Sequence, residues 1–157
     1  MGSHPEPLSQ LEVLAVDCQA TAAAPRGHLI EIGWARVRKT ITHARACLIA
    51  LPDSEQIPPA VARITGISER MMRDAVDGHR AWRALSDQAA SLSHQPAPTV
   101  IHFARFEQPF LRSLAAGPFP LDVVCARDIG RRLLPNLPRC SLRALSGYFG
   151  RAVGALR

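Results

Sequence analysis

The chain has 157 residues, of which 47% are hydrophobic, and its formal net charge is +6. That length predicts a single domain whose core is large enough to be stable without disulfides, and the hydrophobic content excludes a disordered tail. No apolar run approaches the roughly 20 residues of a membrane span, and the polar start MGSHPEP is no signal peptide, so we expect a cytoplasmic protein with no membrane partner.

Arginine supplies nearly all of the positive charge, because Lys39 is the only lysine. Guanidinium groups suit phosphate recognition, which favours a nucleic-acid partner. The alternative is compositional, since a GC-rich genome also yields an arginine-rich and lysine-poor chain. The cysteines form no CxxC pair and no zinc-like cluster with histidines, so we expect scattered buried thiols. They are Cys18, Cys47, Cys125 and Cys140.

Three strands are expected in the first third of the chain. Residues 1–7 are interpreted as a tag remnant and disordered lead, and 8–157 as one domain. The apolar run LEVLAV predicts a buried strand, and the alternation in HLIEIGWARV predicts a second. A third follows after a link short enough for an antiparallel hairpin. These strands cover residues 11–16, 28–37 and 41–49.

The rest of the chain alternates helices and short strands. Apolar stripes at helical spacing and the positions of the prolines predict helices, and two short apolar runs predict strands. The helices cover residues 58–64, 79–94, 106–115, 127–134 and 141–149, and the strands cover 99–102 and 121–125. This order predicts an α/β fold with a five-stranded mixed sheet, made of a three-strand antiparallel meander plus two parallel strands and flanked by helices. The ribonuclease H-like fold has this order of elements.

Three polar residues stand where the expected strands end and a helix begins. Asp17 closes the first strand, at the sheet edge where open α/β folds bind ligands, and His102 closes the fourth. Glu107 follows at the start of a helix, so its carboxylate and that of Asp17 could converge and hold a divalent ion, as phosphoryl transfer requires. Simpler alternatives stay open: an Asp that caps its own turn, a polar strand end, and an acid placed favourably near a helix N-terminus.

Five segments, in order, resemble the proofreading-type 3′–5′ exonucleases of the DEDD family, which include DNA polymerase III epsilon-like and RNase T-like domains. The family's first motif is Asp-x-Glu-x-Thr, and here a strand leads into DCQAT at 17–21. The family strand IIEIG is matched by LIEIG at 29–33, and a Pro-containing stretch by IPPAVARITGIS at 57–68. The second motif, His-Asn-Ala-x-Phe-Asp, is matched by HFARFE at 102–107. The fifth and last matched segment comprises two helices, IGRRLLP at 129–135 and SLRALSGYFG at 141–150.

The resemblance implies a two-metal phosphodiesterase site. In that family, four carboxylates hold two divalent ions, Mg²⁺ or Mn²⁺, and a histidine (or tyrosine) of the last motif orients or deprotonates the attacking water. Carried over residue by residue, Asp17 and Glu107 would be metal ligands, and Gln19 would complete the catalytic set. The implied substrate contacts are Ala20, Thr21, His102, Phe103 and Phe106.

The sequence departs from the family pattern at several of these positions. Gln19 replaces a glutamate and removes a negative charge, and Phe103 replaces an asparagine. Glu107 carries its carboxylate one methylene further out than an aspartate, and displacing a catalytic group by about 1 Å costs on the order of 100-fold in rate. No His-x-x-x-x-Asp follows 141–150, so we expect a domain that lacks its final helix and last motif and is weakly active or inactive.

Three functions remain open at this point. The first is a 3′–5′ exonuclease acting on single-stranded or frayed DNA or RNA 3′ ends, alone, with a polymerase or with a fused nuclease module. The second is a catalytically degenerate relative that binds nucleic acid or a partner protein, which the changes at Gln19 and Phe103 favour. The third is an interaction domain with no nucleic-acid role.

Overall fold

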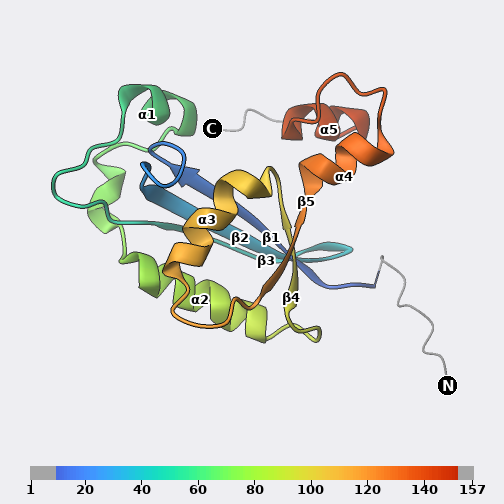
Figure 1. Cartoon of the computed structure of the whole chain (residues 1–157), viewed down its shortest axis with the longest axis horizontal. Coiled ribbons are helices and arrows are strands. Elements are labelled where there is room, and N and C mark those ends of the chain that lie inside the picture. The colour runs from blue at the N-terminus through green and yellow to red at the C-terminus, as the bar shows by residue number, and fades with distance from the viewer. Residues whose placement is uncertain (1–9, 152–157) are drawn as a thin grey trace.

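The computed structural model describes residues 10–151, which contain one five-stranded sheet and the helices around it (Figure 1). The strands are β1 (Val13–Ala20), β2 (Leu29–Arg38), β3 (Thr40–Leu48), β4 (Ala97–Ile101) and β5 (Leu121–Cys125). The helices are α1 (Pro59–Thr65), α2 (Gly78–Ala90), α3 (Ala104–Leu114), α4 (Ala126–Leu133) and α5 (Leu142–Tyr148), with a 3₁₀ turn, η1 (Met71–Asp74).

The sheet has the order β3-β2-β1-β4-β5. Neighbours β3, β2 and β1 are antiparallel, whereas β1, β4 and β5 are parallel. This arrangement confirms the predicted fold: an α/β mixed sheet built from an antiparallel meander and two parallel strands. The predicted hairpin between β2 and β3 is also present, and Lys39 makes its tight link in the left-handed region at a φ of 57°.

The main core lies between one face of the sheet and the helices α2 and α3. Along β1, Leu14, Val16 and Cys18 alternate toward this core, as period-2 packing requires. Helix α2 lies beside α3 over the same face, in agreement with the stripe expected from the sequence (Figure 1). The buried residues of α2 are Ala81, Trp82, Leu85 and Ala89.

The opposite face of the sheet is more open. Apart from the main core, and not on this open face, a smaller cluster of Ile30, Ile57 and Ile67 packs near α1. Helices α4 and α5 follow β5 at the far edge, so that α1 and the α4–α5 pair lie toward two ends of the sheet (Figure 1). Between them, small side chains of the central strands line a hollow, which is described below.

Two boundaries differ from the sequence prediction in a way that matters for the site. The first strand was expected to end before Asp17, but β1 continues to Ala20 because its backbone stays paired with β2. Strand pairing requires backbone partners rather than apolar side chains, so the charged residue does not end the strand. Helix α3 begins at Ala104, ahead of the expected start at Phe106. The residue before it, Phe103, occupies the N-cap position with a left-handed backbone and makes no side-chain capping bond.

Other expectations were met in part. Cys18 and Cys140 are buried, whereas Cys47 and Cys125 are only half-buried, and all four thiols are free. The η1 turn had no counterpart in the sequence prediction. The proposed tag remnant at 1–7 lies outside the described residues. Among residues 10–151, none of the helices is both long and apolar enough to span a membrane.

Candidate nuclease-type site

Strand β1 places Asp17 and Gln19 on the open face of the sheet, opposite the side chain of the buried Cys18. Both side chains line a hollow of about 720 Å³, here called the carboxylate hollow. The other strand residues that line it include Ala15, Glu31, Gly33, Ala35 and Val100. His102, just after β4, also lines it, as do Ile64, Thr65, Ala126 and Leu142 from the helices around it. The hollow therefore combines a polar end with a largely apolar wall.

Asp17 and Gln19 form a directly bonded pair in this hollow. The Gln19 amide donates to Asp17 Oδ2 across 2.9 Å. Protein atoms around the Asp17 carboxyl remove part of its hydration and raise its pKa, although the side chain still reaches solvent. The Gln19 hydrogen bond and the nearby His102 act in the opposite direction and lower that pKa. Gln19 thus stabilises the ionised Asp17 but adds no negative charge of its own.

Glu107 lies in the first turn of α3 and is buried, with 4% of its surface exposed. The Cys18 backbone N–H and thiol lie close to its carboxyl group and act to lower its pKa, while Oε2 has no hydrogen-bond partner within residues 10–151. Burial, followed by the negative charge of Asp17, raises the pKa of Glu107 to about 8. An unpartnered buried carboxylate oxygen costs free energy unless a proton or a cation satisfies it.

Asp17 and Glu107 come from distant parts of the sequence, and they are near enough for the charge of Asp17 to act on the Glu107 carboxyl. Strand β4 pairs with β1 only as far as Val16, opposite Ile101. Beyond that pair, the chain turns into α3, whose first turn carries Glu107 close to Cys18. Asp17 faces the hollow, whereas Glu107 lies behind it in the protein.

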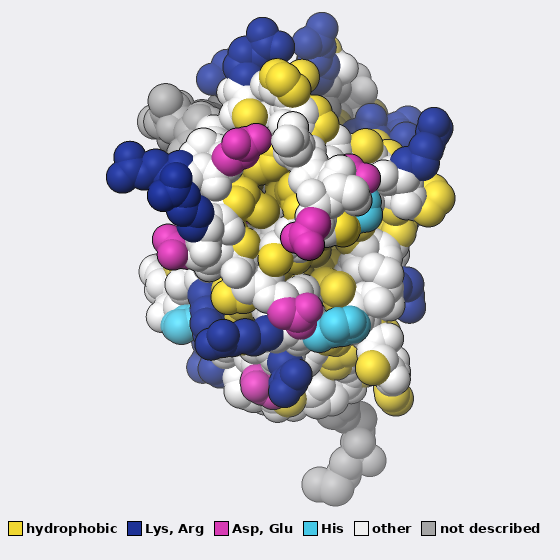
Figure 2. Space-filling view, turned by 90° about the vertical axis from the view of Figure 1, so that its left-hand side faces the viewer, with side chains coloured by type: hydrophobic (Ala, Val, Ile, Leu, Met, Phe, Trp, Pro, Cys, Tyr) yellow, Lys and Arg dark blue, Asp and Glu magenta, His cyan; other side chains and the backbone are white. Residues whose placement is uncertain are grey.

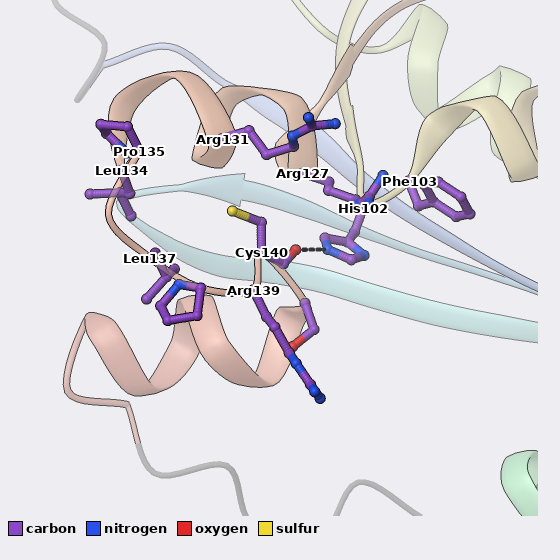
Figure 3. A pocket seen from close by; sticks show the side chains of 11 residues that line it. His102, Phe103, Arg127, Arg131, Leu134, Pro135, Leu137, Arg139 and Cys140 are labelled. Atoms are coloured by element: carbon purple, nitrogen blue, oxygen red, sulfur yellow. Dashed lines mark hydrogen bonds between the residues drawn. The ribbon is translucent and has the colours of Figure 1, made fainter.

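His102 follows β4 and lines two neighbouring hollows. Its Nε2 lies 2.8 Å from the carbonyl oxygen of Cys140. A carbonyl only accepts, so Nε2 carries the proton and Nδ1 is the acceptor atom of the neutral ring. His102 lines the carboxylate hollow and also a second hollow of about 690 Å³ beside α4 (Figure 3).

Ala20 and Thr21 occupy structural positions at the end of β1. The Thr21 hydroxyl accepts from the His28 N–H, and the Thr21 N–H donates to the His28 carbonyl, both across 2.8 Å. These bonds close the loop between β1 and β2, and Ala20 packs against the main core. Neither residue is among those that line the carboxylate hollow, so their role as nucleotide contacts stays a prediction.

Phe103 and Phe106 stack on each other, with ring centres 6.4 Å apart. Phe103 has a left-handed backbone (φ 65°, ψ 47°), an uncommon conformation for an aromatic residue. The guanidinium groups of Arg105 and Arg127 lie 4.8 and 4.9 Å from its ring centre. Phe103 lines the second hollow rather than the carboxylate hollow, and Phe106 lines neither.

Sequence reasoning did not single out Glu31 or the arginines beside the second hollow. Glu31 pairs across strands with Gln19 and lines the carboxylate hollow. The alternation of buried and exposed residues in β2 could have indicated Glu31, because it falls on the face opposite the buried Ile30 and Ile32. The arginines had no such signal, since an isolated arginine in a sequence looks the same in a hollow as on open surface.

The residues present fit one divalent ion better than two. Asp17 and Glu107 offer two carboxylates, one of them with an unpartnered buried oxygen. A half-turn of the Gln19 amide would direct its oxygen, a neutral ligand, toward the same point. However, within residues 10–151 no group of three or more His, Cys, Asp or Glu side chains is arranged to hold a metal ion.

Known structures share this fold. No protein-family model and no curated protein matches the sequence. A product-bound exonuclease I superposes with a TM-score of 0.76 at 13% identity, covering 93% of this chain and 40% of that one. An Escherichia coli exonuclease I in complex with a dT13 oligonucleotide gives 0.74 at 14% identity, covering 92% and 37%. Exonuclease X in complex with 5′-overhanging duplex DNA gives 0.67 at 21% identity, covering 90% and 75%.

At these identities the similarity concerns the fold. The chain also spans well under half the length of the exonuclease I chains that it matches. Its ribonuclease H-like sheet and flanking helices nevertheless superpose over nine-tenths of the chain. The chain therefore has the fold of exonucleases I and X.

Proposed function

We propose that this chain is a 3′–5′ exonuclease-type domain that takes the 3′ end of a single-stranded or frayed DNA or RNA strand. The observation that supports the proposal is that the charge of Asp17, which lines the carboxylate hollow, acts on the buried carboxyl of Glu107, in a chain that shares its fold with exonucleases. In the reaction, water attacks the phosphorus of the terminal phosphodiester. The bond to the 3′ oxygen of the preceding nucleotide breaks, and a 5′-mononucleotide leaves.

Each residue of the site has a role that follows from its position. Asp17 and Glu107 would hold a divalent ion, Mg²⁺ or Mn²⁺, which when bound supplies positive charge for phosphodiester hydrolysis. Gln19 orients Asp17 through its amide, and the apolar wall excludes water around a bound base or sugar. His102 presents a polar ring at the same end of the hollow.

A second candidate is a catalytically degenerate module that binds nucleic acid or a protein partner. Gln19 favours it, because the neutral amide bonded to Asp17 offsets no cation charge. The raised pKa of Glu107, about 8, points the same way, since a large share of this carboxyl is protonated at neutral pH when no cation is bound. Both features weaken metal binding, which needs deprotonated ligands.

A digestion assay separates the two candidates. Oligonucleotides of DNA and RNA, labelled at the 5′ end, are incubated with Mg²⁺ or Mn²⁺ and resolved on a sequencing gel. The exonuclease proposal expects a ladder that shortens from the 3′ end, and Asp17→Ala should slow it by at least on the order of 100-fold. The matched control is Asp87→Ala, an exposed acid on α2 over the other face of the sheet.

The outcomes differ cleanly. Equal and negligible digestion by the native protein and Asp17→Ala would overturn the exonuclease proposal. If the same proteins still bind the labelled strand without metal, the degenerate nucleic-acid-binding module is supported instead.

A further inference from the structure

The second hollow is lined by three arginines and by no acidic residue. It lies where the residues after β4 meet α4 and the loop that leads to α5 (Figure 3). Arg127 and Arg131 come from α4, and Arg139 comes from the loop. This site is called the arginine hollow below, and its volume is about 690 Å³.

The positive charges in the arginine hollow are uncompensated within the described chain. Neither of the ion pairs found among residues 10–151 involves Arg127, Arg131 or Arg139. Asp128 borders a shallower depression next to Arg131 but forms no ion pair with it. Arginines gathered in one concavity repel one another, and an anion that accepts their planar N–H groups relieves this repulsion.

The rest of the lining argues for a chain of phosphates rather than a small free anion. Apolar side chains line the hollow together with the arginines, and a sugar or base can pack against them beside the phosphate contacts. These residues are Phe103, Leu134, Pro135, Leu137 and Pro138. The guanidinium group of Arg127 also lies 4.9 Å from the Phe103 ring centre, which fixes a charge beside an aromatic face.

The arginine hollow and the carboxylate hollow are neighbours that share one lining residue, His102. The hydrogen bond from His102 to the Cys140 carbonyl ties the loop of the arginine hollow to the end of β4. A ligand that begins beside Asp17 and extends past His102 therefore enters the arginine hollow. Figure 2 shows the left-hand side of the molecule as seen in Figure 1, away from α4 and α5; hydrophobic side chains occupy a hollowed centre there, with acidic side chains around it.

We propose that the arginine hollow is a phosphate subsite for the phosphodiester groups of a single nucleic-acid strand whose terminal nucleotide lies in the carboxylate hollow. The placement of the terminal nucleotide in the carboxylate hollow rests on the function proposed above. The phosphate contacts do not depend on that function, because they involve only Arg127, Arg131 and Arg139. Each guanidinium contacts one phosphate, and the apolar lining packs against the sugars and bases between them.

The test measures strand binding in EDTA, where no hydrolysis occurs. A fluorescent oligo(dT) is titrated across a salt series with the native protein and with the triple variant Arg127→Gln, Arg131→Gln, Arg139→Gln. Single strands lose about 0.7 in the slope of log K against log salt per phosphate contact, so the triple variant should lower the slope by about 2. At about 0.1 M salt, the same loss weakens binding by on the order of 100-fold.

The matched control is the triple variant Arg70→Gln, Arg80→Gln, Arg83→Gln. It changes the net charge equally, and its exposed arginines line none of the hollows described above. A double variant, Arg131→Gln with Arg139→Gln, leaves the Arg127–Phe103 contact in place. It therefore controls for the possibility that the triple variant loses binding because it misfolds. It should lower the slope by about 1.4.

Several results would overturn the subsite. One is an equal change of slope in the two triple variants, and another is competition by inorganic phosphate as effective as that by the strand. Absence of strand binding by the native protein at low salt would remove the nucleic-acid role along with the subsite. A strand that binds through these arginines but is never digested leaves the subsite standing and overturns only the exonuclease proposal.

Discussion

Replacing Glu107 by glutamine should remove most of the loss of stability that this protein shows as pH rises. The pKa of Glu107 is raised from 4.5 to about 8, so the folded state binds this proton more tightly than the unfolded chain does. Between those two pH values, the native protein's free energy of unfolding therefore falls as pH rises, and it levels off above about pH 8. Asp17, whose pKa is also raised, contributes in the same direction.

The magnitude follows from the size of that window. Each pH unit within it is worth about 1.4 kcal/mol, and solvent near Asp17 screens part of the effect, so the loss reaches about 2–4 kcal/mol. Glutamine is neutral at every pH and can keep the acceptor for the Cys18 N–H. Glu107→Gln should match the native protein near about pH 5 and exceed its stability by about 2–4 kcal/mol near about pH 8.5.

Urea unfolding in EDTA, followed by the fluorescence of Trp34 and Trp82, measures both profiles, and unchanged m-values show that the two proteins unfold alike. Parallel profiles for the native protein and Glu107→Gln would refute the assignment of a buried, protonated Glu107. The control is Glu12→Gln, because Arg36 lowers the pKa of Glu12 through a hydrogen-bonded ion pair. That pair stabilises the fold above the ordinary pKa of a glutamate and is lost in acid, so this variant should be less stable at neutral pH by up to about 1 kcal/mol and unchanged in strong acid.

Three further variants test the site and the fold. Gln19→Glu replaces the amide that bonds to Asp17 with a like charge, so it should lower the melting temperature in EDTA and increase the rise in melting temperature on adding Mn²⁺; a smaller metal-induced rise than in the native protein would contradict the site geometry. Asp77→Ala removes the N-cap that accepts from the His79 and Arg80 amides, and urea unfolding should show a loss of about 1 kcal/mol. Leu85→Ala empties a fully buried position under α2 and should cost about 2–5 kcal/mol in the same assay; a loss below about 1 kcal/mol would mean that Leu85 is not in the core.

Much of the fold could be predicted because most elements have one buried face. Alternation in β1 and β2 and the apolar stripe of α2 report directly on the core that those faces form. Boundaries were harder, since backbone pairing carries β1 past Asp17, and the left-handed Phe103 begins α3 earlier than its apolar spacing indicates. Neither feature depends on side-chain polarity.

The site divides in the same way. The convergence of Asp17 and Glu107 could be expected from the order of the strands, because one strand and the helix after its parallel neighbour meet at one edge. The partner of His102 could not be expected, since it is the backbone carbonyl of Cys140, and any residue type supplies that atom. The arginine hollow likewise depends on how a loop folds back, which leaves no periodic signal in the sequence.

Binding of Mn²⁺ tests most directly whether Asp17 and Glu107 form one cation site. Electron paramagnetic resonance of free Mn²⁺ in a titration at about pH 8.5, where Glu107 is largely ionised, measures bound ion without requiring activity. We predict saturable binding by the native protein, strong weakening in both Asp17→Asn and Glu107→Gln, and no change in Asp87→Asn. Binding that survives both substitutions unchanged, or that is lost equally in the control, would contradict a shared site.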